Sequence, residues 1–238
     1  VAGEKAQLLA LCEGYNDLAA VLGVTPQGRS GRTDGGPPPA PPGELGRKQG
    51  MIFGLVEKLA AKSPTASPAE GMGPGIASSL DGRWRLRFTT AADAKPPGVG
   101  ETYQEVRCGE IINVLAFPAP SPVERIEVRL EGSAASPTRV RLVFDRVRTV
   151  WREPQWFALW QRETEVQLPR PGTPVAEFLA RLTNADREQG AYFEVLYLDD
   201  DLRIHRTAEG NVFIQTRDSA ETADAQAAGG GDGAVAET

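Results

Sequence analysis

The segment at residues 80–90 constrains the fold of this chain more than any other, because it alternates strictly between apolar and basic side chains. Its apolar members are Trp84, Leu86 and Phe88, and its basic members are Arg83, Arg85 and Arg87. Successive side chains of a strand point to opposite faces, so the pattern predicts a strand with one apolar and one basic face. Gly82, two residues before the tryptophan, permits a sharp turn, and a large indole ring can close one end of a β-barrel.

Other short segments show strand patterns and are separated by turn residues. The expected strands lie at residues 80–90, within 102–117 as two strands separated near Gly109, at 123–131 and 139–147 as a hairpin, and at 192–198, 202–206 and 211–217. Many short strands with few helices between them are typical of a closed antiparallel sheet. The sequence therefore predicts a mainly β protein built on an antiparallel β-barrel.

Helices are predicted mainly before residue 80. Apolar residues recur every three or four positions in residues 4–22 and again in residues 47–62, which indicates two amphipathic helices. Residues 25–46 are rich in Pro and Gly and are expected to form a linker, and Thr173 is expected to cap one short helix before the last strands. The expected regions are helices and Pro/Gly-rich linkers packed on the barrel (1–79), the barrel domain (80–218) and a disordered acidic tail (219–238).

Composition narrows the class of protein. A formal net charge of -6 over 238 residues argues against general nucleic-acid binding. The two cysteines, Cys12 and Cys108, fall in different predicted elements, so we expect no disulfide framework and a reducing compartment. No apolar run is long enough to span a bilayer. We expect a processed chain whose targeting peptide is not part of this sequence.

Few residues suggest catalysis or metal binding. The single histidine, His205, lies on the strand face opposite Leu202 and Ile204, so we expect it on the surface. Residues 199–201 are three consecutive aspartates that could hold a hard cation, but a solvated turn between strands explains them better. No zinc-binding pattern and no phosphate-binding loop occurs. We therefore expect no catalytic residues, no metal and no cofactor.

The alternation also predicts which side chains point into the barrel. The predicted inward set is Trp84, Leu86, Phe88, Ile126, Val128, Leu130, Val140, Leu142, Phe144, Phe193, Val195 and Tyr197. In a small barrel such residues either pack as a solid core or enclose one small ligand. Both alternatives remain open from the sequence.

Residues 151–160 concentrate aromatic side chains. This cluster consists of Trp151, Trp156, Phe157 and Trp160. Indole rings are favoured at a pocket mouth or a lipid interface, but they also fill barrel ends, and we favour that structural role. Arg146, Arg148, Arg152 and Arg162 flank the cluster, which would suit an anionic lipid headgroup or form an ordinary charged rim.

Arginines also form the outer face predicted for residues 80–90. Arg83, Arg85 and Arg87 would present three positive charges that could contact lipid headgroups at a membrane or lipid-globule surface. Outward charges on strands are common, however. Arg203 is expected to lie against Trp84 at the end of the barrel, where a cation–π contact would be structural.

Four motifs resemble the plastid lipid-associated protein family, also called plastid fibrillins or plastoglobulins. Residues 80–90 resemble the family's L-x-G-x-W-x-L-x-Y/F-T opening, and residues 109–114 resemble its G-x-I-x-N-V segment. Residues 197–204 resemble its Y-L-D-x-D-L-R-I signature, and residues 210–214 resemble the G-N-L-F-V run that follows. The linker at 25–46 is longer than the family's usual connection.

The resemblance implies a lipocalin-like barrel in the chloroplast, associated with thylakoids, plastoglobules or the stroma. It also implies a hydrophobic ligand, which would be a prenylquinone, a carotenoid or an acyl lipid. No catalytic residue follows from it.

Three functional hypotheses are consistent with the sequence. The first is a non-enzymatic protein that binds or organises hydrophobic metabolites at a peripheral membrane or lipid-globule surface. The second is an interaction module with a solid barrel core that docks on a chloroplast protein complex through its outer faces. The third, an enzyme acting on lipid, has little support from individual residues.

Overall fold

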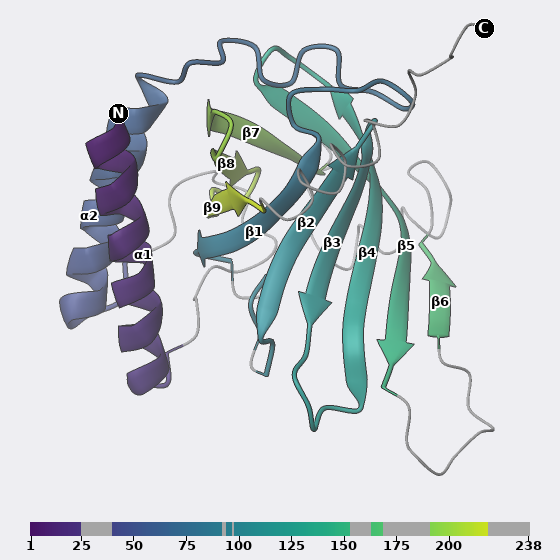
Figure 1. Cartoon of the computed structure of the whole chain (residues 1–238), viewed down its shortest axis with the longest axis horizontal. Helices are drawn as coiled ribbons and strands as arrows, with labels where there is room; N and C mark the ends of the chain where they lie inside the picture. Colours follow the sequence, from purple (N-terminus) through teal and green to yellow (C-terminus); the bar gives the residue numbers. More distant parts are fainter. Residues whose placement is uncertain (25–39, 92–93, 97, 153–162, 169–190, 219–238) are drawn as a thin grey trace, which may run out of the picture.

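A computed structural model describes residues 1–24, 40–91, 94–96, 98–152, 163–168 and 191–218. Among these residues it contains two helices and nine strands in one antiparallel sheet (Figure 1). The elements are α1 (Ala2–Val21), α2 (Gly43–Ala60), β1 (Gly82–Thr89), β2 (Glu101–Arg107), β3 (Glu110–Ala116), β4 (Val123–Ala134), β5 (Arg139–Trp151), β6 (Glu163–Gln167), β7 (Ala191–Leu198), β8 (Leu202–Thr207) and β9 (Val212–Arg217).

The sheet closes on itself. Its strand order is β4-β3-β2-β1-β9-β8-β7-β5-β6, and a further pairing between β4 and β5 completes a ring of strands. On the side away from β4, β5 pairs with β7 through its first residues and with β6 through its last residues. The prediction of a mainly β, lipocalin-like antiparallel fold is therefore confirmed.

Three predicted element boundaries need correction. The strand expected to end at residue 131 continues to Ala134, which pairs with Val140. The predicted linker at 25–46 is too long, because α2 already begins at Gly43 and buries Leu45 in its first turn. The strand expected to end at residue 147 continues to Trp151, because its last residues pair with both β4 and β6. The short helix expected after Thr173 and the tail at 219–238 lie outside the described residues.

The two helices cover the outside of the ring beside β1, β7, β8 and β9 (Figure 1). Residues four or seven positions apart share one face of a helix, and α1 buries Leu8, Cys12 and Tyr15 in this way. They pack with apolar side chains on the outer face of the strands, such as Ile204 and Ile214. The helices are thus part of one hydrophobic core with the sheet.

This packing reverses the expected orientation of β8. Leu202 and Ile204 point outward, against the helices, so the alternate residues Arg203 and His205 point into the ring. His205 is only 4% exposed, and the prediction of a surface histidine is wrong. Its position opposite two apolar residues was read correctly, but those residues face the helices instead of the interior.

Two β-bulges change the direction of side chains within a strand. Leu86 and Phe88 pair with the consecutive residues Gln215 and Ile214, so Arg87 is an extra residue in β1. An extra residue shifts the alternation by one position. Phe88 therefore packs against the helices, although Trp84 in the same strand points inward.

The same shift occurs in β7. Val195 and Tyr197 pair with the consecutive residues His205 and Ile204, so Leu196 is the extra residue. Val195 packs inside the ring and Tyr197 packs with the helices. The prediction that Phe88 and Tyr197 point inward is thus corrected by one bulge in each strand.

The segment between α2 and β1 closes one end of the ring. Ala69, Met72 and Leu80 pack with Trp84 in a second apolar cluster inside the strands. Backbone hydrogen bonds tie the segment to the strand turns: the Gly75 N–H donates to the Cys108 carbonyl, and the Ala134 N–H donates to the Met72 carbonyl. We call residues 63–81 the end plug.

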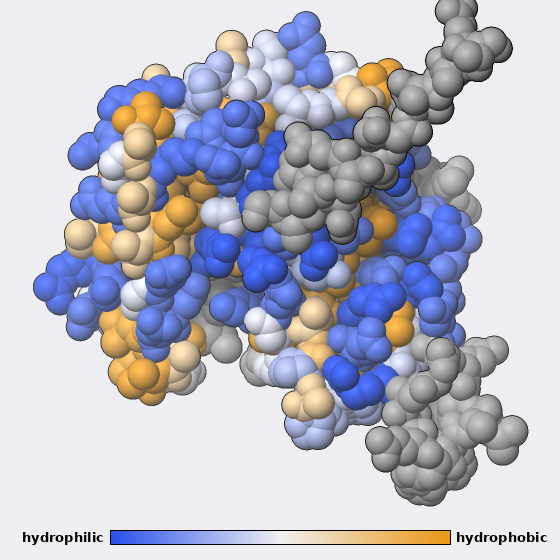
Figure 2. Space-filling view, viewed as in Figure 1, coloured by the Kyte–Doolittle hydropathy of each residue, from blue (hydrophilic) through white to orange (hydrophobic). Residues whose placement is uncertain are grey.

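The surface is mostly hydrophilic over the strands and more apolar over the helices in the view of Figure 2. Exposed apolar side chains of the helical region include Val21, Leu22 and Met51. Within the described residues, neither helix has the length and apolar character needed to cross a bilayer.

Candidate ligand-binding cavity

A cavity of about 300 Å³ lies inside the ring. Inner faces of strands on both sides of the ring form its walls. Its apolar wall includes Leu86, Leu115, Val128, Leu130, Leu142, Phe144, Phe193 and Phe213. Phe144 is 42% exposed, so the apolar wall reaches the surface at this residue. Small-molecule sites are typically concave and mostly apolar, with a few placed polar groups.

Four polar side chains form one part of the cavity wall. They are Gln104, Asn113, His205 and Gln215, and we call them the polar wall. Gln104 pairs with Trp84 across β1 and β2, which places the polar wall next to the end plug. The cavity therefore has an apolar part and a polar part.

Arg203 stands behind the polar wall and holds two of its members. Its Nη2 donates to Gln104 Oε1 at 2.5 Å and to Gln215 Oε1 at 2.6 Å, and its Nε donates to Gln215 Oε1 at 3.0 Å. Gln104 Nε2 in turn donates to Asn113 Oδ1 at 2.6 Å. Arg203 is 0% exposed, and burial together with nearby Arg217 lowers its pKa to about 9.

Two guanidinium groups lie over the indole of Trp84 at the plugged end. Arg203 Cζ is 4.8 Å and Arg217 Cζ is 4.2 Å from the ring centroid. Trp84 Nε1 donates to the Leu80 carbonyl at 2.8 Å. The prediction that Arg203 lies against Trp84 is confirmed.

His205 is held between two aromatic rings. Its ring centroid is 4.7 Å from that of Phe193 and 4.8 Å from that of Phe213, with which it is stacked. Burial, and then the charge of Arg203, hold the pKa of His205 well below its ordinary value. The imidazole is therefore neutral at pH 7, with one donor nitrogen and one acceptor nitrogen.

The other predicted site residues divide by position. Leu86, Val128, Leu142, Phe144 and Phe193 line the cavity as expected. Trp84 and Val140 belong to the solid cluster beside the end plug, and Phe88 and Tyr197 lie outside the ring against the helices. Ile126 is half-buried on β4 and is absent from the cavity wall.

The tryptophan cluster is only partly described. Trp151 ends β5, is 41% exposed and donates from Nε1 to Thr164 Oγ1 at 3.1 Å. It does not line the cavity. Trp156, Phe157 and Trp160 lie outside the described residues.

The arginines of β1 contact acidic or polar side chains. Arg85 lies 3.0 Å from Glu101 and 3.2 Å from Asp218, and Arg83 lies 3.7 Å from Asp218. Arg83 also stacks on Tyr103. Arg87 donates to Thr216 Oγ1 at 2.8 Å.

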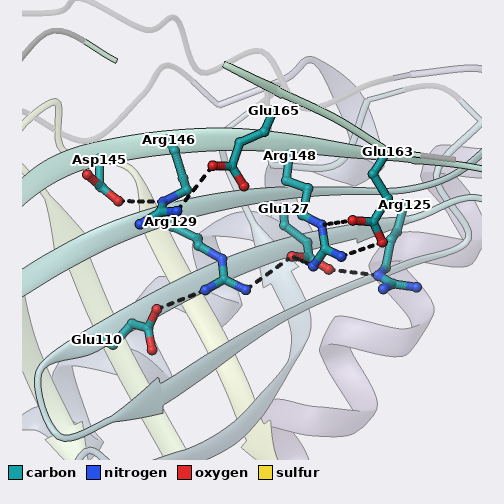
Figure 3. A network of polar contacts seen from close by, with 9 residues as sticks. All are labelled: Glu110, Arg125, Glu127, Arg129, Asp145, Arg146, Arg148, Glu163 and Glu165. Carbon is teal, nitrogen blue, oxygen red and sulfur yellow. Dashed lines mark hydrogen bonds and ion pairs between the residues drawn. The ribbon is translucent and has the colours of Figure 1, made fainter. Parts of the chain in front are cut away.

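A larger network of charges covers the outer face of β3, β4, β5 and β6. Figure 3 shows its members, which are Glu110, Arg125, Glu127, Arg129, Asp145, Arg146, Arg148, Glu163 and Glu165. Glu127 is its centre, with Arg125 at 2.8 Å, Arg148 at 3.3 Å and Arg129 at 3.7 Å. The flanking arginines Arg146 and Arg148 thus contact carboxylates on this face.

Two further hollows lie beside α1. The larger, of about 440 Å³, is lined by charged side chains that include Glu13, Arg85 and Glu101. The smaller, of about 170 Å³, lies between α1 and β1. The first suits water better than an apolar ligand and the second is smaller than the cavity in the ring, so the latter is the candidate site.

Sequence reasoning missed the polar wall. In β8, His205 alternates with Leu202 and Ile204, and we expected the histidine at the surface. No direction was predicted for Gln215 in β9. The alternation was a usable signal, but its direction depends on which face the helices cover. Among the described residues, no group of three or more His, Cys, Asp or Glu side chains could hold a metal ion.

Comparison with known proteins gives one match. The family model PAP_fibrillin matches residues 46–216. The match begins within α2 and spans the rest of that helix, the end plug and nearly all of the sheet. No curated protein and no solved structure matches the chain.

Proposed function

Because the chain belongs to the PAP_fibrillin family, whose members are plastid lipid-associated proteins, we propose that it binds a hydrophobic metabolite inside its ring of strands. The observation that carries this proposal is the cavity of about 300 Å³ with its apolar wall. Binding is passive in this proposal, and the ligand is a prenylquinone, a carotenoid or an acyl lipid.

The volume limits how much of such a ligand the ring encloses. Water occupies about 30 Å³ per molecule in the liquid, so the cavity offers room for about ten atoms of similar size. A longer isoprenoid or acyl chain would extend past Phe144 to the surface. Each buried methylene would contribute about 0.8 kcal/mol to binding, which gives a chain of ten carbons a substantial driving force.

The direct test is to identify what the native protein carries. The full chain would be purified from its plastid, extracted with organic solvent and analysed by mass spectrometry. A stoichiometric isoprenoid or acyl lipid is the expected result. Protein that carries no lipid and binds none of the three ligand classes in vitro would contradict the proposal.

A cavity-filling variant links binding to this cavity. Leu142→Trp adds bulk to the cavity wall and should abolish ligand uptake, because an indole would occupy much of the available volume. The control is Val166→Trp on the exposed strand β6, which should bind as the wild type does. Equal binding by both variants would place the ligand elsewhere.

We also propose contact with a thylakoid or plastoglobule surface through the basic face of β1. The support is that β1 carries three arginines: Arg83 and Arg85 lie near the carboxylates of Asp218 and Glu101, and Arg87 donates to the neutral hydroxyl of Thr216. Sedimentation with vesicles containing phosphatidylglycerol tests this proposal. The triple Arg→Gln variant should lose binding that falls with added salt, and unchanged sedimentation would contradict it.

The alternative function is docking on a chloroplast protein complex. Exposed apolar residues of the helical region, namely Val21, Leu22 and Met51, favour it. Native purification separates the two functions. A co-purifying polypeptide without lipid would favour docking, and the cavity residues would then be structural.

A further inference from the structure

We propose that the polar wall of the cavity recognises a carboxylate, so that the preferred ligand is an acyl chain with a free acid group. This inference rests on the proposed function, because it assumes that the cavity takes an apolar ligand. It assigns the direction of binding: the carboxylate lies against Gln215, Asn113 and His205, and the chain extends along the apolar wall toward Phe144.

The first step of the argument is the orientation of the glutamines. A guanidinium group can only donate hydrogen bonds. The side-chain oxygens of Gln104 and Gln215 must therefore face Arg203, as they do at 2.5 and 2.6 Å. This contact fixes which end of each amide is left for other partners.

The second step is that donors remain available at the cavity. Gln215 Nε2 has no hydrogen-bond partner among the described residues, since both contacts of this side chain are made by its oxygen. Gln104 Nε2 donates to the side-chain oxygen of Asn113, so the contact of Asn113 is also made by its oxygen. Asn113 Nδ2 therefore has no hydrogen-bond partner among the described residues either. Both residues line the cavity. The polar wall thus offers N–H groups to an acceptor on a ligand.

The third step is the imidazole of His205. The ring lines the cavity and is only 4% exposed. Its Nδ1 has no hydrogen-bond partner among the described residues. A buried polar atom without a partner is costly. In the tautomer that carries its proton on Nδ1, the ring presents an N–H without a partner, and a ligand oxygen at the polar wall would accept this hydrogen bond.

The fourth step is charge. Arg203 is fully buried, and the described residues place no carboxylate in contact with it: its partners are two amides and the face of Trp84. Its Nη1 also lacks a partner. Buried charges are normally paired. A ligand carboxylate would supply the missing negative charge across the oriented amides, which an alcohol or ester cannot do.

The position of Glu209 supports the same direction. This carboxylate lines the cavity and follows the C-terminal end of β8, which is Thr207. Arg203 lies at the opposite end of β8, beside the end plug. A negative headgroup is therefore attracted to the plugged end and repelled at the other.

The test compares two probes of equal chain length, dodecanoic acid and dodecanol, by isothermal titration of the full chain. Hydrogen bonds to a charged group are stronger than those to a neutral one, so we expect the acid to bind at least about tenfold more tightly. His205→Phe retains aromatic packing with Phe193 and Phe213 and should reduce this ratio several-fold. Asn113→Leu is a second variant that should reduce it if His205→Phe does not fold.

The matched control is Leu142→Ala, which shortens the apolar wall and leaves the polar wall intact. It should weaken both probes equally and preserve their ratio. Equal affinity of the wild type for both probes would overturn the carboxylate assignment and leave the proposed function standing. A ratio that survives both His205→Phe and Asn113→Leu would also overturn it. If neither probe binds, and if neither a prenylquinone nor a carotenoid binds, both proposals are overturned.

Discussion

Trp84 joins three parts of the molecule through one side chain. Its ring packs with the end plug, its Nε1 bonds to Leu80, and Arg203 and Arg217 lie over its faces. It is 0% exposed. The Gly-x-Trp pattern at residues 82–84 thus marks the closed end of the ring, as the size of the indole predicted.

Replacing Trp84 by Ala should cost about 3 to 5 kcal/mol of unfolding free energy, because a large aromatic group would leave a cavity in the core. Urea denaturation followed by far-ultraviolet circular dichroism measures this cost. Trp151→Ala is the control, since Trp151 is partly exposed at the end of β5, and it should cost less than about 1 kcal/mol. Equal costs would mean that Trp84 has no special role in closure.

Asp199 is the second residue whose contacts reach across the fold. It lies in the turn between β7 and β8, where Oδ2 is 2.7 Å from Lys5 Nζ of α1 and accepts a bond of 2.6 Å from the Tyr197 hydroxyl. The backbone N–H groups of Asp201 and Leu202 donate to Oδ1. Burial opposes ionisation, but these contacts together lower the pKa of Asp199.

This lowered pKa predicts a pH-dependent contribution to stability. The carboxyl of an unfolded aspartate has a pKa of about 3.9, and the folded value lies below it. The stabilisation is therefore present above pH 4 and is lost as the pH falls through the folded pKa. Asp199→Asn should cost about 1 to 3 kcal/mol at pH 7, and the difference from wild type should shrink in urea titrations below pH 4. The exposed Asp200→Asn serves as control, and a constant difference would contradict the prediction.

At the scale of elements, the strands were predictable and the direction of their faces was not. Alternation located β1, the β4–β5 hairpin and β7 to β9, because a half-buried strand must place apolar residues at every second position. Alternation alone cannot reveal a bulge, which depends on the partner strand. Phe88 and Tyr197 were therefore assigned to the wrong face after the extra residues Arg87 and Leu196.

His205 shows the same limit from another cause. An apolar stripe in β8 was identified correctly, but only the packed helices show that this stripe faces outward. The local sequence of β8 carries no information about a helix that lies some 190 residues earlier in the chain. The inward position of His205 in the polar wall could not be predicted for this reason.

The end plug depends on a close approach at Gly109. This residue has φ +80 in the turn between β2 and β3, and an added Cβ would lie 2.4 Å from the Gly73 carbonyl oxygen. Gly109→Ala should therefore destabilise the fold by more than the roughly 1 to 2 kcal/mol expected from the backbone conformation alone. Gly75→Ala measures that backbone cost, because Gly75 has φ +77 and open space around it. Equal losses in urea denaturation would show that the plug yields to a methyl group.

At the scale of the whole molecule, β5 holds the ring together. It pairs with β4 along its length, and its two halves pair with β7 and β6. All five residues of β6 are exposed, and β5 is its one pairing partner among the described strands. Stability should therefore be unevenly distributed across the sheet.

Hydrogen exchange measured by mass spectrometry tests this distribution. Amides of β4 and the first half of β5 should exchange only through opening of the whole ring, with a free energy close to that of global unfolding. Amides of β6 should exchange with little protection. Slow exchange in β6 would mean that this strand is covered by a part of the chain beyond the described residues.

The apolar outer faces of β8 and β9 also limit how the chain can be shortened. A fragment that begins at residue 80 would retain the nine described strands but would uncover Leu202, Ile204, Val212 and Ile214, which α1 and α2 now cover. Such a fragment would present a broad apolar sheet to water and would be prone to self-association. The strands and the two leading helices therefore form one folding unit, even though the family match begins only at residue 46. Any tag, fusion or domain swap should leave both helices attached.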